Sequence, residues 1–258
     1  LNFALLEDFD HLYRFANLLK TDFNIDADTL VGKFTEITPG RPTIAHHRHP
    51  VDNVKFSMDA DKADLYTKLV GGIITAAEQQ TMNFYMNMGQ MYKNELGRKL
   101  FAEIAMVEEE HVTQYESLKD PTCTWLEQWV MHEYTECYLY YSAYEDESDP
   151  YIKNIWLTHF EMECAHLKRA IECLKKYGKT DYTKVLPKQD FPLLLKFGSN
   201  IDYVRDVLSH TANFTCEYEE YRELDKLKSS RYCDHNAKIN KATKYVASHL
   251  VIEKHIKK

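Results

Sequence analysis

The stretch LFAEIAMVEEEH, residues 100–111, ends in a Glu-x-x-His pair, and IWLTHFEMECAH, residues 155–166, ends in a second one. Positions i and i+3 share one face of an α-helix, so the carboxylate of Glu108 converges with the imidazole of His111. The same spacing joins Glu163 to His166. Such groups are costly to place in a helical core unless a cation neutralises them. The two motifs therefore predict metal ligands, with exposed surface charge as the alternative.

Further glutamates precede the motifs at matched distances. Glu78 lies 30 residues before Glu108, and Glu133 lies 30 residues before Glu163, so the whole pattern repeats as a duplicated helical hairpin. The midpoint of each pair falls in a polar, turn-forming segment. Because a helix rises by about 1.5 Å per residue, equal distances from a turn place both partners at the same height. We expect Glu78 to face Glu108, Glu133 to face Glu163, and all four to lie in one layer.

The low glycine and proline content, at 8 and 7 residues, favours long helices. Irregular segments are expected at 21–57 and 179–200. Four consecutive helices of similar length are typical of a four-helix bundle, here at about 59–177. We interpret the chain as one all-α domain, with an N-terminal helix and arm (1–58), the bundle, and a C-terminal extension (178–258) that contributes two more helices. The apolar periodicity predicts helices at 3–20, 59–88, 95–118, 124–144, 151–177, 201–228 and 236–257.

This pattern resembles the ferritin-like di-iron carboxylate superfamily, in which two helices give one Glu each and two others give Glu-x-x-His. The extra glutamate in Glu133-x-x-Glu136 is similar to the rubrerythrin group. The resemblance implies two metal ions, iron or alternatively manganese, with Glu108 and Glu163 as bridging ligands and Glu136 as an additional one. The implied ligand set is Glu78, Glu108 and His111 for one ion, and Glu133, Glu163 and His166 for the other.

Two features depart from that family. No C-x-x-C pair occurs, so the electron-transfer module of a full rubrerythrin is absent from this sequence. Only 21 residues separate His111 from Glu133, whereas the ferritin-like fold has a long crossover at this point. Either the chain crosses in an extended stretch near 117–125, or its connectivity differs from the family.

The resemblance implies a redox enzyme that activates O₂ or peroxide, of the oxidase, peroxidase or oxygenase type. Such an enzyme needs an electron donor and can take a small organic substrate. Tyr85 and Tyr140, which the repeat pairs, are candidate catalytic residues that handle radicals or protons, with simple packing as the alternative. The other functions considered are ferroxidase and iron handling, and a metal-free helical interaction protein.

The amino-acid composition limits the kinds of partner and the cellular location that we expect for the protein. A net charge of −8 gives no basic surface for nucleic acid. No run of 18 apolar residues occurs, which predicts no membrane span. With no signal peptide visible, we expect reduced cysteines and a cytoplasmic location. A homodimer is left open. His159 is a secondary metal candidate that is more readily explained as a hydrogen-bonded core histidine. The cluster His46, His47 and His49 is another, more readily explained as an exposed loop.

Overall fold

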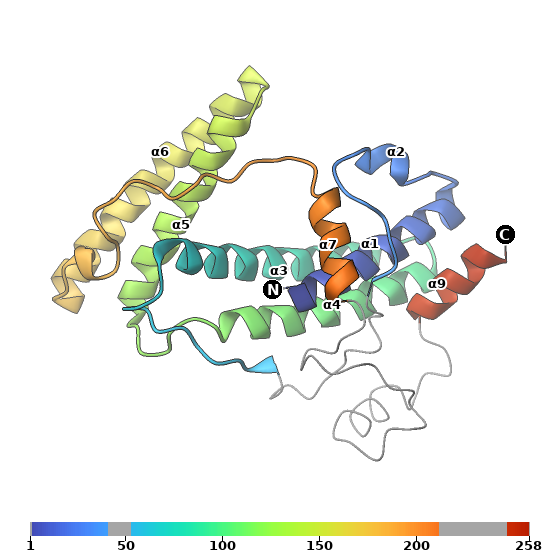
Figure 1. Cartoon of the computed structure of the whole chain (residues 1–258), viewed down its shortest axis with the longest axis horizontal. Coiled ribbons are helices and arrows are strands. Elements are labelled where there is room, and N and C mark those ends of the chain that lie inside the picture. The colour runs from blue at the N-terminus through green and yellow to red at the C-terminus, as the bar shows by residue number, and fades with distance from the viewer. Residues whose placement is uncertain (1, 41–52, 212–246, 258) are drawn as a thin grey trace, which may run out of the picture. The chain divides into compact units, whose positions relative to one another are not determined.

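The computed structural model describes residues 2–40, 53–211 and 247–257 (Figure 1). Throughout these ranges the regular elements are helices and no strand occurs, so the predicted all-α class is confirmed. A π-helical turn, Leu174–Gly178, continues α6, and a 3₁₀ turn spans Tyr182–Lys184. The α-helices are α1 (Asn2–Phe23), α2 (Asp28–Val31), α3 (Leu65–Met91), α4 (Glu95–Glu116), α5 (Trp125–Asp146), α6 (Pro150–Cys173), α7 (Ile201–Thr211) and α9 (Ala247–Ile256).

The four helices predicted between residues 59 and 177 correspond to α3, α4, α5 and α6. Helix α3 begins later than predicted, because Asp64 acts as its cap and accepts a hydrogen bond from the backbone N–H of Thr67 at 2.8 Å. At the start of α5, Thr124 and Glu127 form a reciprocal capping box. In the described part of the predicted irregular segment 21–57, a short helix, α2, occurs that the sequence pattern did not indicate.

The helix predicted at 59–88, with its end just before Gly89, continues through this glycine, because Gly89 lies inside α3. A Cβ atom at this position would lie 2.7 Å from the Cβ atom of Phe101 on α4, which is closer than side chains pack. Gly89 therefore allows the backbone of α3 to approach α4, and the turn follows two residues later, after Met91.

Replacing Gly89 with alanine should lower the free energy of unfolding by about 1–3 kcal/mol, because the added methyl group overpacks the contact with Phe101. Gly72, also within α3, is a matched control. Its added Cβ would meet Thr135 at an ordinary 3.6 Å, so Gly72→Ala should gain about 0.5–1 kcal/mol from helix propensity. Urea unfolding of both variants checks this prediction, and equal effects of one sign would contradict it.

The chain divides into two compact units. Unit 1 comprises residues 1–54, 78–113 and 198–258, and unit 2 comprises residues 55–77 and 114–197. Helix α3 changes unit at Glu78, and α4 changes unit after Thr113. The predicted division at residues 58 and 177 differs from these boundaries, and the prediction of a single domain stays a prediction.

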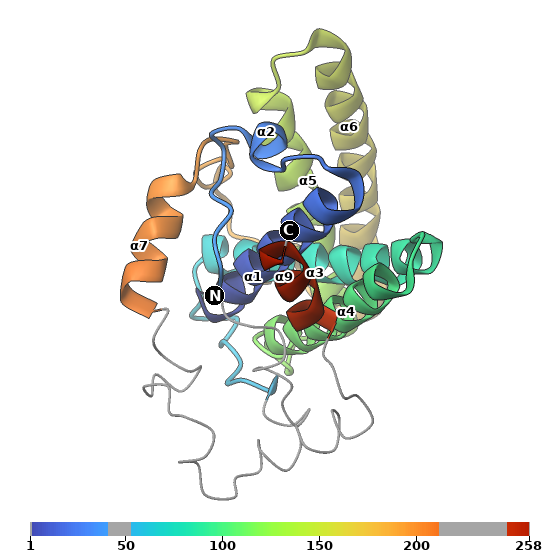
Figure 2. The same ribbon diagram turned by 90° about the vertical axis from the view of Figure 1, so that its right-hand side faces the viewer.

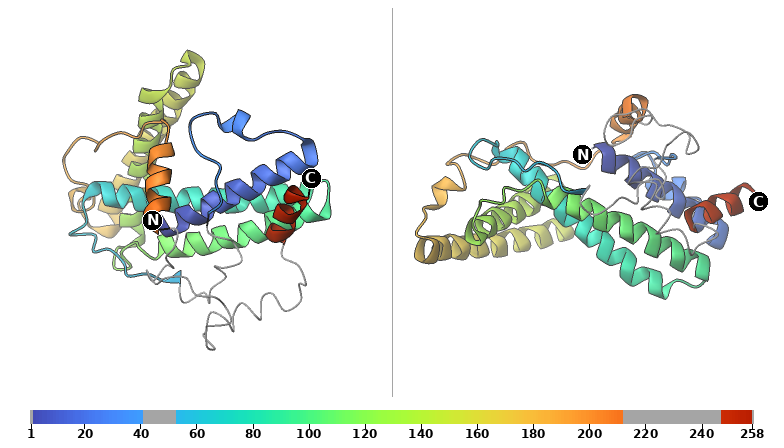
Figure 3. Two further views of the ribbon diagram at one scale, coloured as in Figure 1. Left: turned by 45° about the vertical axis from the view of Figure 1, so that its right-hand side comes forward. Right: turned by 90° about the horizontal axis from the view of Figure 1, so that it is seen from below.

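Unit 1 is built on α1. Helix α1 packs against α9 and α7, and the views in Figures 2 and 3 show α9 alongside it. One apolar core joins Leu18 of α1, Leu100 and Ile104 of α4, and Val251 of α9. A second joins Leu6 and Phe9 of α1 to Val204 and Val207 of α7. Helix α1 therefore has apolar contacts on two sides, which fixes the direction of its polar side chains.

Unit 2 centres on the antiparallel hairpin of α5 and α6 (Figure 1). Val130 on α5 packs against Ala170 on α6 and against Leu174 and Leu186 that follow it. A second cluster joins Tyr138 on α5 to Leu65 and Leu69 at the start of α3. Figure 3 shows the hairpin from two further directions. This hairpin is the second half of the predicted duplication.

The segment between α4 and α5 is a series of tight turns. Backbone hydrogen bonds join Leu118 to Tyr115, Lys119 to Glu116, and Cys123 to Asp120. An extended crossover at 117–125 is therefore absent from this described segment, and the connectivity departs from the ferritin-like pattern there. None of the helices in the described ranges has the length and apolar character needed to cross a membrane.

Candidate metal centre

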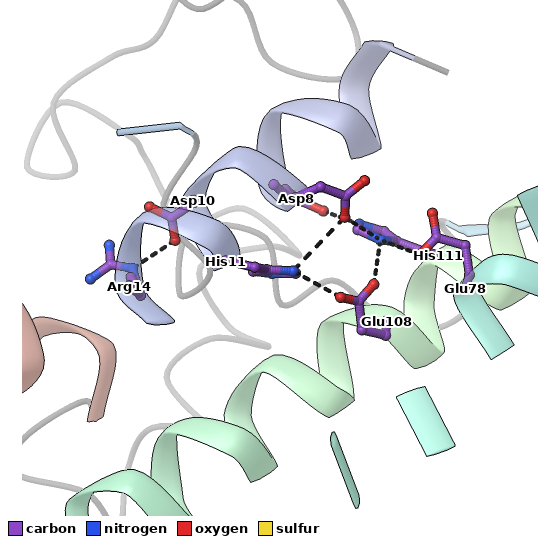
Figure 4. Close-up of polar contacts among 8 residues, drawn as sticks. Asp8, Asp10, His11, Arg14, Glu78, Glu108 and His111 are labelled. Carbon is purple, nitrogen blue, oxygen red and sulfur yellow. Dashed lines mark hydrogen bonds and ion pairs between the residues drawn. The ribbon is translucent and has the colours of Figure 1, made fainter. Parts of the chain in front are cut away.

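Three helices of unit 1 bring a group of acidic and imidazole side chains together (Figure 4). Helix α1 supplies Asp8, α3 supplies Glu78, and α4 supplies Glu108 and His111. One potential ligand atom from each of the four lies within 4.8 Å of every other. This buried group, called the α1–α3–α4 cluster below, also includes Glu7 and His11 of α1, which contact its members.

His111 is at the centre of the cluster. Its Nδ1 atom lies 3.1 Å from Glu108 Oε2 and 3.4 Å from Glu78 Oε2. Its Nε2 atom donates a hydrogen bond to Glu7. In metal sites, a carboxylate that accepts from the outer nitrogen of a histidine holds the ring so that the inner nitrogen faces the ion. Glu7 is placed to do this for His111.

Most side chains of the cluster are buried. Glu7, Glu108 and His111 are each at most 1 % exposed, and Glu78 is 8 % exposed. Asp8 differs, because 39 % of its side chain is accessible. Asp8 is therefore the most accessible of these side chains.

The pKa values of the side chains in the cluster are shifted in different directions. Burial alone would lower the pKa of His111, but hydrogen bonds to Glu108, Glu7 and Glu78 hold it well above its ordinary value. Burial alone would raise the pKa of Glu108, yet His11 and His111 keep it below the ordinary range. For Glu78 burial dominates, and its pKa is raised. Desolvation likewise raises the pKa of Asp8 to about 7.

The structure brings together Glu78, Glu108 and His111, as the spacing predicted. Sequence reasoning missed the contribution of α1, namely Glu7, Asp8 and His11. A signal for it was present, because Asp8-x-x-His11 has the same acid-x-x-His spacing as the two motifs on α4 and α6. It begins with aspartate and lies outside the duplicated hairpins, so the repeat could not reveal it.

The second predicted group also assembles, in unit 2. His166 Nδ1 lies 3.0 Å from Glu163 Oε2 and 3.9 Å from Glu133 Oε2. Trp129 donates to Glu133 Oε1 at 2.6 Å. The imidazole of His166 is 54 % exposed, in contrast to the buried His111. This group, called the α5–α6 cluster, could hold a metal ion at the surface of its hairpin.

The remaining candidates lie near the two clusters. Glu136 is half-buried, and burial, with Glu163 and Glu133 nearby, raises its pKa. It is not part of the group whose ligand atoms converge. Tyr140 packs against Trp156 and His159, with ring centroids 6.1 and 5.1 Å away. His159 is thus part of an aromatic contact.

Tyr85 belongs to the aromatic cluster beside the buried site. Its ring packs against Phe15 and Phe101 at centroid distances of 5.0 and 5.9 Å. Burial raises its pKa above the ordinary phenol value, and the charges of Glu108, Asp8 and Glu78 add to the rise. Tyr85 therefore remains a protonated phenol close to the α1–α3–α4 cluster.

Some predictions lie beyond what the structure describes. His46, His47 and His49 fall outside the described residues, as do Cys216 and Cys233. The described cysteines, Cys123, Cys137, Cys164 and Cys173, are free thiols. Because the two clusters belong to different units, a common layer of all four glutamates stays a prediction.

The donor set suits a hard or borderline divalent cation. Carboxylate oxygens with imidazole nitrogen, and no thiolate among the converging atoms of the described residues, are ligands common to several divalent metal ions. A buried carboxylate and histidine group of this kind could hold metal ions. Comparison with known protein families, with curated proteins and with solved structures finds no match to this chain.

Proposed function

We propose that the protein is a carboxylate metalloprotein that uses iron or manganese at the α1–α3–α4 cluster to activate O₂ or peroxide. The observation that carries this proposal is the charge imbalance of the buried cluster. Four carboxylates, of Glu7, Asp8, Glu78 and Glu108, surround two imidazoles, so with every carboxylate ionised even two imidazolium ions would leave a net charge of −2 on these six side chains. A divalent cation supplies the missing charge.

Among the residues that the structure describes, the arginine of α1 belongs to a different ion pair. Arg14, on the same helix, is paired with Asp10 at 2.6 Å. Without metal, the raised pKa values of Asp8 and Glu78 favour uptake of protons, which would relieve part of the repulsion. A metal ion would replace these protons, as expected where deprotonated ligands and binding are coupled.

The residues of the chain would each have a definite task in such a reaction. A bound redox metal would supply the electron chemistry with O₂ or peroxide. Glu7 would orient His111, and the exposed side at Asp8 would admit the small oxidant. Tyr85, a phenol in the aromatic cluster that stays protonated, would be the candidate hydrogen-atom donor. The electron donor and any organic substrate belong to this proposal only as chemical classes.

Metal analysis followed by oxidant consumption tests this function. The full chain is stripped with chelator, loaded with Fe²⁺ without oxygen, and assayed for bound iron and then for O₂ or peroxide consumption with a chemical reductant. We expect tight binding and repeated turnover, both greatly reduced in Glu78→Gln. Glu109→Gln is the control, because Glu109 is exposed beside Glu108 on α4.

Each outcome decides one part of the proposal. Absence of bound metal would overturn it and favour a metal-free interaction protein. Binding without turnover would overturn the redox activity alone. Continued uptake of added iron as mineral, in a large oligomer, would favour iron handling instead.

A further inference from the structure

Glu108 lies between two imidazoles, one on each of its carboxylate oxygens. His11 Nδ1 lies 2.9 Å from Oε1, and His111 Nδ1 lies 3.1 Å from Oε2 (Figure 4). The two rings are stacked with centroids 6.2 Å apart and an interplanar angle of 25°. The cluster is thus nearly symmetrical about the carboxylate of Glu108.

Asp8 takes part in the same symmetry. Its Oδ1 atom lies 3.8 Å from Nδ1 of His11 and 3.8 Å from Nδ1 of His111. Each imidazole therefore shares two carboxylates with the other, Glu108 and Asp8. A carboxylate that offers one oxygen to each of two positions is the arrangement of a bridging ligand, and ions in two-metal sites lie about 3.5–4 Å apart.

The imidazole–carboxylate distances would allow metal ions to replace the protons that these groups share. Metal–nitrogen and metal–oxygen bonds of about 2.1 Å at a right angle separate the two ligand atoms by about 3 Å. The imidazole–carboxylate separations of 2.9 and 3.1 Å on the two sides of Glu108 match this distance between two ligand atoms of one ion. Each side therefore accommodates an ion with little movement of the side chains.

His11 is also almost fully buried. Its side chain is 3 % exposed, and its Nε2 atom has no hydrogen-bond partner among the residues that the structure describes. Burying an imidazole with one unpartnered nitrogen is unfavourable for folding. Coordination at Nδ1, which faces Asp8 and Glu108, would offset that penalty.

We infer that the α1–α3–α4 cluster holds two metal ions, the second on His11, with Glu108 and Asp8 between them. This inference rests on the proposed function and extends it. It differs from the family resemblance, which implies Glu133, Glu163 and His166 as ligands of the second ion. The first ion takes His111 and Glu78, so the two-ion centre needs unit 1 alone.

The test counts ions in a chain whose α5–α6 cluster has been disabled by Glu163→Gln and His166→Asn. Mn²⁺ is titrated by equilibrium dialysis, and its electron paramagnetic resonance spectrum is recorded. We expect two ions per chain with an exchange-coupled signal. Adding His11→Phe should leave one ion with an uncoupled signal. His132→Phe, at an exposed position of α5, is the matched control and should keep two.

A second variant guards against misfolding of His11→Phe. Asp8→Asn changes the most accessible member of the cluster. It should lower the affinity for the second ion by at least tenfold and leave the helical circular dichroism spectrum unchanged. Two coupled ions in both variants, or a single ion in the parent, would overturn the inference and leave the proposed function standing. Absence of any bound ion in the parent would overturn both.

Discussion

Replacing Glu108 with glutamine should lower the free energy of unfolding of the metal-free protein by about 3 kcal/mol, because it breaks a buried ion-pair network. The carboxylate accepts hydrogen bonds from His11 and His111 on separate oxygens, and it is 1 % exposed. Glutamine has the same shape but only one acceptor oxygen. One buried imidazole would therefore lose its partner, and both would lose a compensating charge.

Urea unfolding at pH 7 with chelator present measures this effect, with Glu109→Gln expected to change stability by less than about 0.5 kcal/mol. The pH dependence has a definite sign. The pKa values of both histidines are raised, so the stabilisation from their protonated forms is lost as the pH rises through those raised values. The difference between wild type and Glu108→Gln should therefore shrink at alkaline pH. An unchanged stability of Glu108→Gln at pH 7 would show that the network contributes nothing.

The local part of the site could be predicted from the sequence. Glu78 and Glu108 lie on consecutive helices at equal distances from a short turn, so the rise of the helix alone places them side by side. The same reasoning joined Glu133 to Glu163. These inferences needed only the positions of the turns, which glycine, proline and polar residues indicate.

The contribution of α1 could not be obtained in this way. Asp8 and His11 lie about 100 residues from Glu108 along the chain, and no turn geometry relates them. Their position depends on how the apolar residues of α1 pack, with Leu18 against α4 and Leu6 against α7. Hydrophobic periodicity shows that a helix has an apolar face, but it does not show which helix covers that face.

Gly89 shows a second limit of local reasoning. Glycine is common where helices end, and this general preference suggested a turn. Within α3 the residue instead relieves a contact with Phe101 on the neighbouring helix. A single sequence does not distinguish a glycine required by backbone conformation from one required by close packing.

Replacing Glu78 with glutamine should have the opposite effect to the change at Glu108 in the metal-free protein. Burial raises the pKa of Glu78, so its charged form opposes folding at pH 7. Glutamine removes that charge and should raise the free energy of unfolding by about 1 kcal/mol. The gain should shrink as the pH falls below the raised pKa, where the folded glutamate takes up a proton, and disappear below the ordinary carboxyl pKa, where the unfolded chain is protonated as well.

With metal present, the wild type should instead be more stable than Glu78→Gln. Glu78 is one of the converging ligands, so Glu78→Gln should weaken metal binding by about 100-fold, which removes about 2.7 kcal/mol of the stabilisation given by excess Mn²⁺. Thermal unfolding with and without Mn²⁺ measures both effects in one variant. A cluster that serves only as a structural ion-pair network would instead lose stability in both conditions, because Glu78 would then be a favourable partner of His111. A metal centre predicts that, without metal, Glu78→Gln raises the free energy of unfolding and Glu108→Gln lowers it. It also predicts that Mn²⁺ stabilises Glu78→Gln less than the wild type. Together these two results would separate a metal centre from an ion-pair network.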